Sequence, residues 1–340
     1  MAIIDKPSDF FNTKLYTGTG SSNAQTGVGF QPDFTWIKER GGAENHNLFD
    51  SVRGVTKRIR SNGTEAEDTR STSLTAFGTD GFTLGSGNQV NDNSATYASW
   101  NWKANGSGST NTDGSINSTV SASATSGFSI VKVSKPNTSV ATIGHGLGVT
   151  PKFIIGKDLD GVDNWTCYSE ALGNGKGIYL NATNAQTTAS TFWNSTSPTS
   201  SVFTIGSDNT WNSPSIVFYC FADVENYSKF GSYAANEDTN GPFIYTGFKP
   251  AFVILKQSNL ARDWIMFDNK RSTSNAVGKY LRPNEAGAED SGEDYLDFLS
   301  NGFKIRNTGA KFNDASGTYI FMAFAENPFV ASNFVPTTAR

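Results

Sequence analysis

Short apolar runs bounded by turn-forming residues are the main pattern along this chain of 340 residues. The runs at 214–222 and 318–325 are almost continuously apolar, which is typical of strands buried on both faces. In the run at 97–103 the large residues partly alternate with small or polar ones, which predicts a strand with one face in water. No segment carries the apolar spacing of an amphipathic helix, although 50–60 and 285–300 have room for one helical turn each. The pattern therefore predicts an all-β protein.

One short phrase occurs three times along the chain. Each copy places a glycine, a proline, a phenylalanine and a lysine at the same relative positions: GFQPDFTWIK at 29–38, GVTPKFIIGK at 148–157 and GFKPAFVILK at 247–256. An aromatic residue follows each of the prolines Pro32, Pro151 and Pro250 at a constant interval, as Phe49, Tyr168 and Phe267. A repeat of this length is too long for one rung of a solenoid and fits an independent β-sandwich.

Two later landmarks appear in the same order in each copy. The first is a short phrase around a phenylalanine: DGFTLG at 80–85, SVFTIG at 201–206 and NGFKIR at 301–306. The second is a closing aromatic run: YASWNWKA at 97–104, IVFYCFAD at 216–223 and YIFMAFAE at 319–326. Because four landmarks agree in order, we interpret the chain as three diverged copies of one module. We expect each module to be a β-sandwich of jelly-roll or lectin-like type, with these repeated phenylalanines buried: Phe34, Phe153, Phe252, Phe82, Phe203 and Phe303.

The repeats predict the domain organisation. They indicate an N-terminal arm at 1–10, module one at 11–104, a Gly/Ser/Asn-rich linker at 105–126, module two at 127–226, module three at 227–328 and a C-terminal arm at 329–340. A short strand around 116–120 is the alternative to a flexible linker. The arms carry Phe10, Phe11, Phe329 and Phe334 outside the repeat, so we expect these arms to contact another molecule or a neighbouring domain.

A lysine ends each of the three proline-led strands. Proline is tolerated at the first position of a strand, where its missing N–H is not needed. We interpret Lys38, Lys157 and Lys256 as solvated strand ends that guard an edge, and a ligand-binding lysine is the alternative.

Composition narrows the classes of function. Aromatic residues make up 13% of the chain and charged residues 17%, and the net charge is −4. A negative net charge argues against a nucleic-acid partner and against a polybasic membrane patch. The first residues, MAIIDKPSDFF, lack a basic stretch followed by an apolar run, and no apolar stretch is long enough to cross a bilayer. We therefore expect neither a secretory signal nor membrane insertion, and a chain that folds in the cytosol.

Residue types that support catalysis or metal binding do not form a defensible pattern. His46 and His145 occupy non-equivalent repeat positions, which argues against a nucleophile–histidine–acid triad. Cys167 and Cys220 read as reduced core residues without zinc-ligand spacing. Phosphate-binding glycine loops are absent. Acidic clusters near 65–68 and 285–294 are interpreted as solvated loops, with Ca²⁺ binding as the alternative. We therefore expect no enzyme activity, no cofactor and no metal.

Two features are candidates for binding. The phrase Phe-Asp-x-x-Arg occurs twice and places Asp50 beside Arg53 and Asp268 beside Arg271. A local ion pair that braces a loop explains it, and contact with a sugar or a partner is the alternative. Trp193 and Trp211 lie in polar stretches without repeat counterparts, so we expect them to be exposed and to stack on sugar rings. Trp165 and Trp264 share a repeat position and are assigned to the core.

The chain resembles the repeated virion proteins of marine tailed bacteriophages, such as those that infect cyanobacteria. The resemblance rests on GFQPDFTWIK, LFDSVRGVTKRI, DGFTLG, YASWNWKA with its following linker, GHGLGVTPKFIIGK, YSKFGSY, GPFIYTGFKPAFVILK, LDFLSNGFKIR and AFAENPF, and covers nearly the whole chain. It implies a virion structural protein, tail-fibre-like, that is assembled in the host cytoplasm.

From this resemblance we expect a non-enzymatic protein of the tail or fibre apparatus. Its partners would be other virion proteins, copies of itself (a trimer is favoured for a fibre) and host-surface glycans. A head decoration or capsid fibre protein is the first alternative. A polysaccharide-degrading tailspike is the second, although the short rungs of a β-helix would show a repeat of roughly 20–25 residues.

Overall fold

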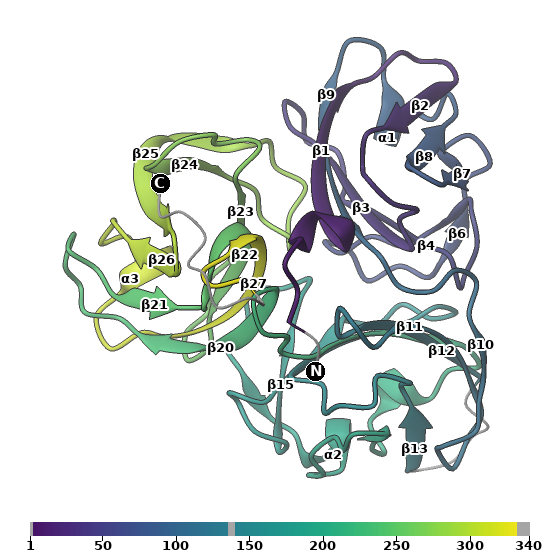
Figure 1. Ribbon diagram of the computed structural model, residues 1–340. Coiled ribbons are helices and arrows are strands. Elements are labelled where there is room, and N and C mark those ends of the chain that lie inside the picture. Colours follow the sequence, from purple (N-terminus) through teal and green to yellow (C-terminus); the bar gives the residue numbers. More distant parts are fainter. Residues whose placement is uncertain (1–2, 135–139, 332–340) are drawn as a thin grey trace.

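Strands and tight turns make up nearly all of the computed structural model, which describes residues 3–134 and 140–331 (Figure 1). The all-β class predicted from the sequence is confirmed. Helical structure in these described residues is limited to single turns: η1 (Pro7–Asp9), α1 (Asn88–Asn91), α2 (Ser190–Trp193), η2 (Asn209–Trp211) and α3 (Ala310–Asn313). The helical turns considered for 50–60 and 285–300 do not form, and residues Asp290–Leu299 are a strand instead.

The first part of the chain forms a four-stranded sheet in the order β1-β9-β3-β4 and a three-stranded sheet in the order β2-β8-β7. A small hairpin joins β5 to β6. The strands are β1 (Phe11–Thr17), β2 (Asn23–Thr26), β3 (Phe34–Glu39), β4 (Asn47–Asp50), β5 (Lys57–Arg58), β6 (Asp68–Thr69), β7 (Leu74–Gly78), β8 (Gly81–Leu84) and β9 (Thr96–Trp102).

The middle part forms an eight-stranded sheet in the order β10-β11-β12-β19-β14-β15-β16-β17 and a two-stranded sheet of β13 and β18. The strands are β10 (Ser109–Asn111), β11 (Ser118–Ser123), β12 (Phe128–Val133), β13 (Ala141–Gly144), β14 (Phe153–Asp158), β15 (Thr166–Ser169), β16 (Lys176–Tyr179), β17 (Thr187–Thr188), β18 (Val202–Ile205) and β19 (Ile216–Phe221).

The last part forms two four-stranded sheets, in the orders β20-β27-β22-β23 and β21-β26-β25-β24. The strands are β20 (Ser228–Ala234), β21 (Phe243–Tyr245), β22 (Phe248–Gln257), β23 (Trp264–Asp268), β24 (Val277–Tyr280), β25 (Asp290–Leu299), β26 (Gly302–Ile305) and β27 (Thr318–Pro328).

The same strand order recurs in all three parts. In each, the closing strand lies between the first strand and the proline-led strand: β1-β9-β3-β4, β12-β19-β14-β15 and β20-β27-β22-β23. The register also agrees, because the phenylalanine of each phrase pairs with an aromatic residue of the closing strand: Phe34 with Trp102, Phe153 with Phe221, and Phe252 with Phe324. We refer to these parts as repeats one, two and three. Their exact boundaries stay a prediction.

The segment 105–126 contains strands and is not only a linker. Strand β11 pairs with β12 over its whole length, and β10 adds outside β11, so both extend the main sheet of repeat two. The alternative of a strand around 116–120 is therefore the better description. The serine and threonine side chains of these strands suit an outer sheet edge that remains partly in water.

The repeats share a hydrophobic core. Alternate residues of each proline-led strand point to opposite faces, so Val253 and Leu255 enter a cluster confined to repeat three. Phe252 and Ile254 enter a cluster built from all three repeats, which we call the shared core. Figure 1 shows the three repeats as lobes around a common centre. The expected wet face of β9 is wrong, because all of 97–102 is buried, and Ala98, Trp100 and Trp102 enter the shared core.

The N-terminal arm and the start of the first strand pack on another repeat of the same chain. Phe11 is the first residue of β1 and stacks on Phe324 of repeat three with ring centroids 5.3 Å apart. Phe10 meets Tyr227 edge to face at 5.9 Å. Of the alternatives considered for this arm, contact with a neighbouring repeat is therefore observed. Phe329 is half-buried, and Phe334 lies outside the described residues.

Candidate functional site

The repeats contact each other in a cyclic order. The Trp165 indole of repeat two donates to the Arg60 carbonyl of repeat one at 2.8 Å, and the Trp264 indole of repeat three donates to the Tyr179 carbonyl of repeat two at 2.8 Å. The third junction uses His46 of repeat one, whose Nε2 lies 3.0 Å from the carbonyl of Arg282 in repeat three. Three backbone bonds follow the same order: Glu67 N to Leu159 O at 2.9 Å, Gln186 N to Ser258 O at 2.7 Å and Glu289 N to Arg40 O at 2.8 Å.

His46 stands where the other repeats have tryptophan, and its partners define its protonation state. The indole N–H of Trp36 donates to His46 Nδ1 at 2.8 Å, so the ring hydrogen lies on Nε2 and is donated to Arg282. Burial lowers the pKa of His46 well below its ordinary value, and the nearby cations Lys38 and Arg271 lower it further. The neutral imidazole is therefore the form that fits this junction.

The three repeated lysines are fully buried, so their interpretation as solvated strand ends is wrong. Lys157 Nζ donates to the carbonyls of Thr64 in repeat one, at 3.0 Å, and Gly161, at 3.5 Å. Lys256 likewise reaches Thr183 of repeat two at 3.3 Å, and Lys38 donates to carbonyls within repeat one. Burial lowers the pKa of each of the three to about 8. These side chains satisfy carbonyls at loops that close the strands.

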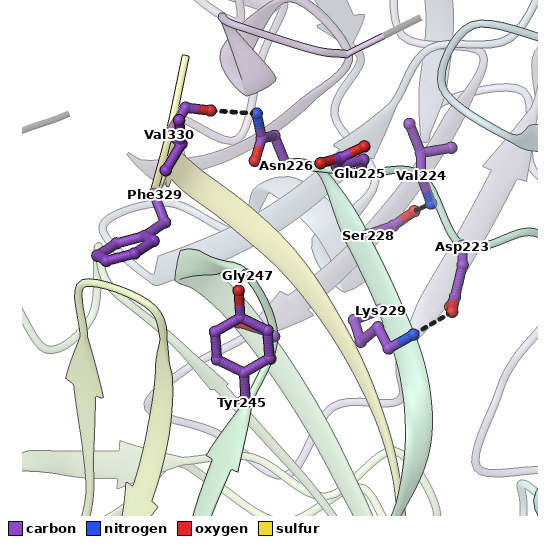
Figure 2. A pocket seen from close by; sticks show the side chains of 11 residues that line it. Asp223, Val224, Glu225, Asn226, Ser228, Lys229, Tyr245, Gly247, Phe329 and Val330 are labelled. Atoms are coloured by element: carbon purple, nitrogen blue, oxygen red, sulfur yellow. Dashed lines mark hydrogen bonds and ion pairs between the residues drawn. The ribbon is translucent and has the colours of Figure 1, made fainter. Parts of the chain in front are cut away.

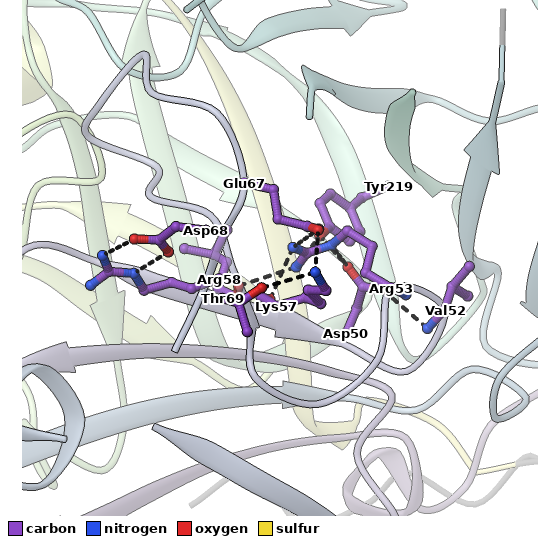
Figure 3. Close-up of polar contacts among 10 residues, drawn as sticks. Asp50, Val52, Arg53, Lys57, Arg58, Glu67, Asp68, Thr69 and Tyr219 are labelled. Atoms are coloured by element: carbon purple, nitrogen blue, oxygen red, sulfur yellow. Dashed lines mark hydrogen bonds and ion pairs between the residues drawn. The ribbon is translucent and has the colours of Figure 1, made fainter. Parts of the chain in front are cut away.

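The first Phe-Asp-x-x-Arg phrase forms a buried polar cluster, shown in Figure 3. The Asp50 carboxylate accepts hydrogen bonds from the backbone N–H groups of Val52, at 3.1 Å, and Arg53, at 2.8 Å, and from the Arg53 guanidinium. The hydroxyl of Tyr219, from repeat two, donates to the same carboxylate at 2.7 Å. Arg53 also bonds Glu67 at 3.1 Å. The cluster joins repeats one and two.

The second phrase repeats this arrangement at another junction. Asp268 accepts from the backbone N–H groups of Lys270, at 3.0 Å, and Arg271, at 2.7 Å, and from the Arg271 guanidinium. Its donor across the junction is the indole N–H of Trp100 in repeat one, at 3.0 Å. Arg271 also bonds Glu289 at 3.3 Å. Arg271 and Arg53 therefore have equivalent partners.

The junction between repeats two and three lacks both halves of this contact. Ser169 pairs with Phe153 just as Asp50 pairs with Phe34, so serine replaces the buried aspartate. By the cyclic order its donor would come from repeat three, where Met322 occupies the register position of Trp100 and Tyr219. The buried aspartate and the side chain that donates to it across the junction are thus present together at two junctions and absent together at the third. This is expected if each polar group needs the other as a partner when buried.

Burial decides between the two interpretations of the Phe-Asp-x-x-Arg phrases. The side chains of Asp50, Arg53, Asp268 and Arg271 are fully buried in ion pairs, so the loop-brace interpretation accounts for them. Their partners across the junction belong to the same chain. None of these four groups presents an atom to a glycan.

Trp193 and Trp211 are also buried, at 1% and 0% exposure, so the prediction that they are exposed is wrong. They pack on each other with ring centroids 5.3 Å apart, and the Trp211 indole donates to the Phe192 carbonyl at 2.7 Å. The turns α2 and η2 carry them into the core of repeat two. Their polar sequence neighbours lie on the outer side of these turns, which is why a polar context did not indicate an exposed ring.

A cavity of about 360 Å³ lies where repeat two passes into repeat three (Figure 2). Three segments build it: the connection 223–229, the turn 245–247 and the residues 329–330 that follow the last strand. The segments are tied together, because Phe329 N donates to Gly247 O at 3.2 Å and the Asn226 amide donates to Val330 O. The cavity therefore has a defined shape within the described part of the chain.

The aromatic wall of the cavity is Tyr245, which is 61% exposed. Its ring lies over Gly247, where an added Cβ would be 3.7 Å from the tyrosine hydroxyl oxygen. Gly247 has φ +85°, a conformation that glycine adopts readily. Thr246 and Gly247 both donate their backbone N–H groups to Asn301 O, at 3.0 and 3.2 Å. The turn that presents the ring is therefore well defined.

The polar wall is the connection between the repeats. Asp223 pairs with Lys229, and the two side chains are 27% and 43% exposed. Glu225 is exposed beside them, and Asn226 is turned into the cavity by a left-handed backbone, with φ +66°. The sequence analysis missed this site. The alternation Phe243-Ile244-Tyr245, with its two aromatic residues on one face, is the signal that could have found it.

In residues 3–134 and 140–331 no cluster of three or more histidine, cysteine or acidic residues could hold a metal ion, and no helix is long and apolar enough to cross a membrane. Cys167 and Cys220 are buried and unpaired with each other, and burial raises the pKa of both thiols.

The fold and these contacts define an all-β protein with β-sandwich character, in which three sheets of matching strand order pack around one shared core. The chain belongs to the family described as "Domain of unknown function (DUF7483)", whose model matches residues 6–328 and so spans all three repeats. No curated protein and no solved structure matches the chain.

Proposed function

We propose that this protein is a non-enzymatic structural component of a tailed-bacteriophage virion, in the tail or fibre apparatus, that contacts the host surface. The resemblance of its repeated phrases to virion proteins of marine phages is the basis of the proposal. The observation that supports it is the shared core, which joins three sandwiches into one body by buried aromatic contacts. A body of this kind suits a part that must keep its shape while it connects larger structures.

The cyclic contacts bear on assembly. Three repeats of one chain already occupy the surfaces through which three identical subunits would form a ring. Contacts with other virion proteins and with further copies of the chain would therefore use the outer surfaces of the lobes. Assembly in the host cytoplasm is part of the same proposal.

The test is to locate the protein in the particle. Purified virions would be analysed by mass spectrometry and by cryo-electron microscopy, with antibody labelling against the three-repeat protein. We expect a fixed copy number and density of the three-lobed shape in the tail or fibres. Absence of the protein from gradient-purified virions contradicts the proposal, and density on the head moves it to the decoration or capsid fibre class.

A further inference from the structure

Exposed aromatic side chains are rare on this molecule although aromatic residues make up 13% of its sequence. Within the described residues, Phe243 and Tyr245 are the two with large exposed rings, at 45% and 61%. Both belong to β21, an edge strand, and they point to the same face because Ile244 between them enters the core of repeat three. Tyr245 lines the cavity described above, whereas Phe243 does not.

The cavity offers two kinds of surface to a ligand. Tyr245 and Phe329 supply aromatic carbon, and the Asp223–Lys229 pair and Glu225 supply charged hydrogen-bonding groups on the opposite side. A sugar ring has the matching halves, because its C–H groups form an apolar face and its hydroxyls lie around the rim. A site with aromatic rings on one side and hydrogen-bonding groups on the other is well suited to such a ligand.

Size and charge narrow the ligand. A volume of about 360 Å³ lies at the lower end of the range for small-molecule sites, which limits the ligand to one or two sugar units. The lining carries Asp223 and Glu225 against the single cation Lys229, which is already paired with Asp223. A carboxylate on the ligand would therefore meet net negative charge. Neutral and amino sugars are compatible with this lining, and acidic sugars are not.

We propose that the cavity bounded by Tyr245, Phe329 and the 223–229 connection binds a neutral or amino-bearing hexopyranose unit of a surface polysaccharide. The Tyr245 ring stacks on the apolar face of the sugar, and Asp223, Glu225 and Lys229 bond its hydroxyls. This inference deepens the host-contact part of the proposed function and rests on it for its biological setting. The binding chemistry itself is tested with the isolated protein.

The experiment measures binding of the full chain to an array of bacterial surface oligosaccharides that contains neutral, amino and acidic sugars, followed by calorimetry with the best oligosaccharide. We expect binding to neutral or amino sugars. Tyr245→Ala should weaken it at least about tenfold, because it removes the stacking ring. Tyr245→Phe should remain within about threefold of the natural protein, because it keeps the ring.

Phe243→Ala is the matched control, because Phe243 is an exposed aromatic residue of the same strand outside the cavity. It should leave the affinity unchanged. Failure of the whole array to bind, a preference for acidic sugars, or equal losses in Phe243→Ala and Tyr245→Ala would each overturn the inference. Virion location is measured separately, so a protein that is present in particles and binds no sugar refutes the site while the proposed function stands.

Discussion

The indole N–H of Trp100 in repeat one donates a 3.0 Å hydrogen bond to the carboxylate of Asp268 in repeat three. Tyr219 of repeat two makes the equivalent contact to Asp50 of repeat one at 2.7 Å. Each bond connects the closing strand of one repeat to the buried Asp–Arg ion pair of a neighbouring repeat. Polar contacts of this kind add specificity to an interface that is otherwise aromatic and aliphatic, because a misplaced partner would leave a buried charge without its donor.

Trp100→Phe tests this bond, and Trp102→Phe provides a matched control. Both tryptophans lie on β9 and enter the shared core, but the indole N–H of Trp102 has no hydrogen-bond partner. Bonds to charged acceptors contribute roughly 1.5–3 kcal/mol. We expect Trp100→Phe to lower the free energy of unfolding by about this much more than Trp102→Phe in urea denaturation. Equal losses would show that the contact contributes nothing beyond packing.

Asp50→Ala should be strongly destabilising. It leaves the fully buried guanidinium of Arg53 with Glu67 as its remaining carboxylate partner, and removing one partner of a buried pair costs roughly 3–5 kcal/mol. Asp9→Ala is the control, because the Lys6–Asp9 pair is exposed and such pairs contribute about 0–1 kcal/mol. The free energies of unfolding of both variants would be compared. A small loss in Asp50→Ala would mean that Arg53 finds water or another acceptor.

Acid should weaken the junction between repeats one and three. The pKa of His46 is lowered in the folded protein, so below the ordinary histidine value of about 6.5 the unfolded chain binds a proton that the folded chain does not. This contribution to stability is therefore complete above about pH 6.5 and is lost as the pH falls toward the lower folded pKa, at up to about 1.4 kcal/mol per pH unit.

The double variant His46→Trp, Trp36→Ile rebuilds the first repeat with the residues of the third, where Trp264 pairs across a junction and Ile254 holds the position of Trp36. Between about pH 6.5 and 4.5 the free energy of unfolding of this variant should fall less than that of the natural protein, as measured by urea denaturation at each pH. Identical pH profiles would show that His46 does not report on the junction.

Alkaline pH should raise the free energy of unfolding, because the buried lysines lose their protons more readily in the folded chain than in the unfolded chain. Burial lowers the pKa of Lys157 to about 8, whereas an unfolded lysine titrates near 10.4. Between these values the unfolded chain binds more protons, so the stability of the natural protein should rise with pH relative to Lys157→Met, by up to about 1.4 kcal/mol per pH unit. Lys152→Met, at a partly exposed lysine paired with Glu170, serves as the comparison variant. If the difference in stability between the natural protein and Lys157→Met does not change with pH, the carbonyl partners of Lys157 keep its ammonium group charged.

The sequence was sufficient to predict the all-β class and many of the structural features that the three repeats share. The three phrases form strands at equivalent places in the sheets, although Pro250 lies inside its strand at a register shift, and the repeated phenylalanines such as Phe34 and Phe203 are buried. These predictions succeeded because strand periodicity, turn residues and internal repetition are local properties that one chain displays in order along its length. The candidate site was partly accessible by the same means, since the alternation around Tyr245 can be read from three consecutive residues.

Exposure was decided by the tertiary structure alone. Lys157 and Asp50 are charged and Trp193 lies in a polar stretch, yet all three are buried. Each is covered by residues distant in the sequence, so no local pattern reports its burial. The cavity beside Tyr245 has the same origin, because Phe329 and the 223–229 connection meet that turn only after repeat three has closed on itself. Local pattern determined which strands form, and the packing of three sandwiches around one core determined which of their side chains remain in contact with water.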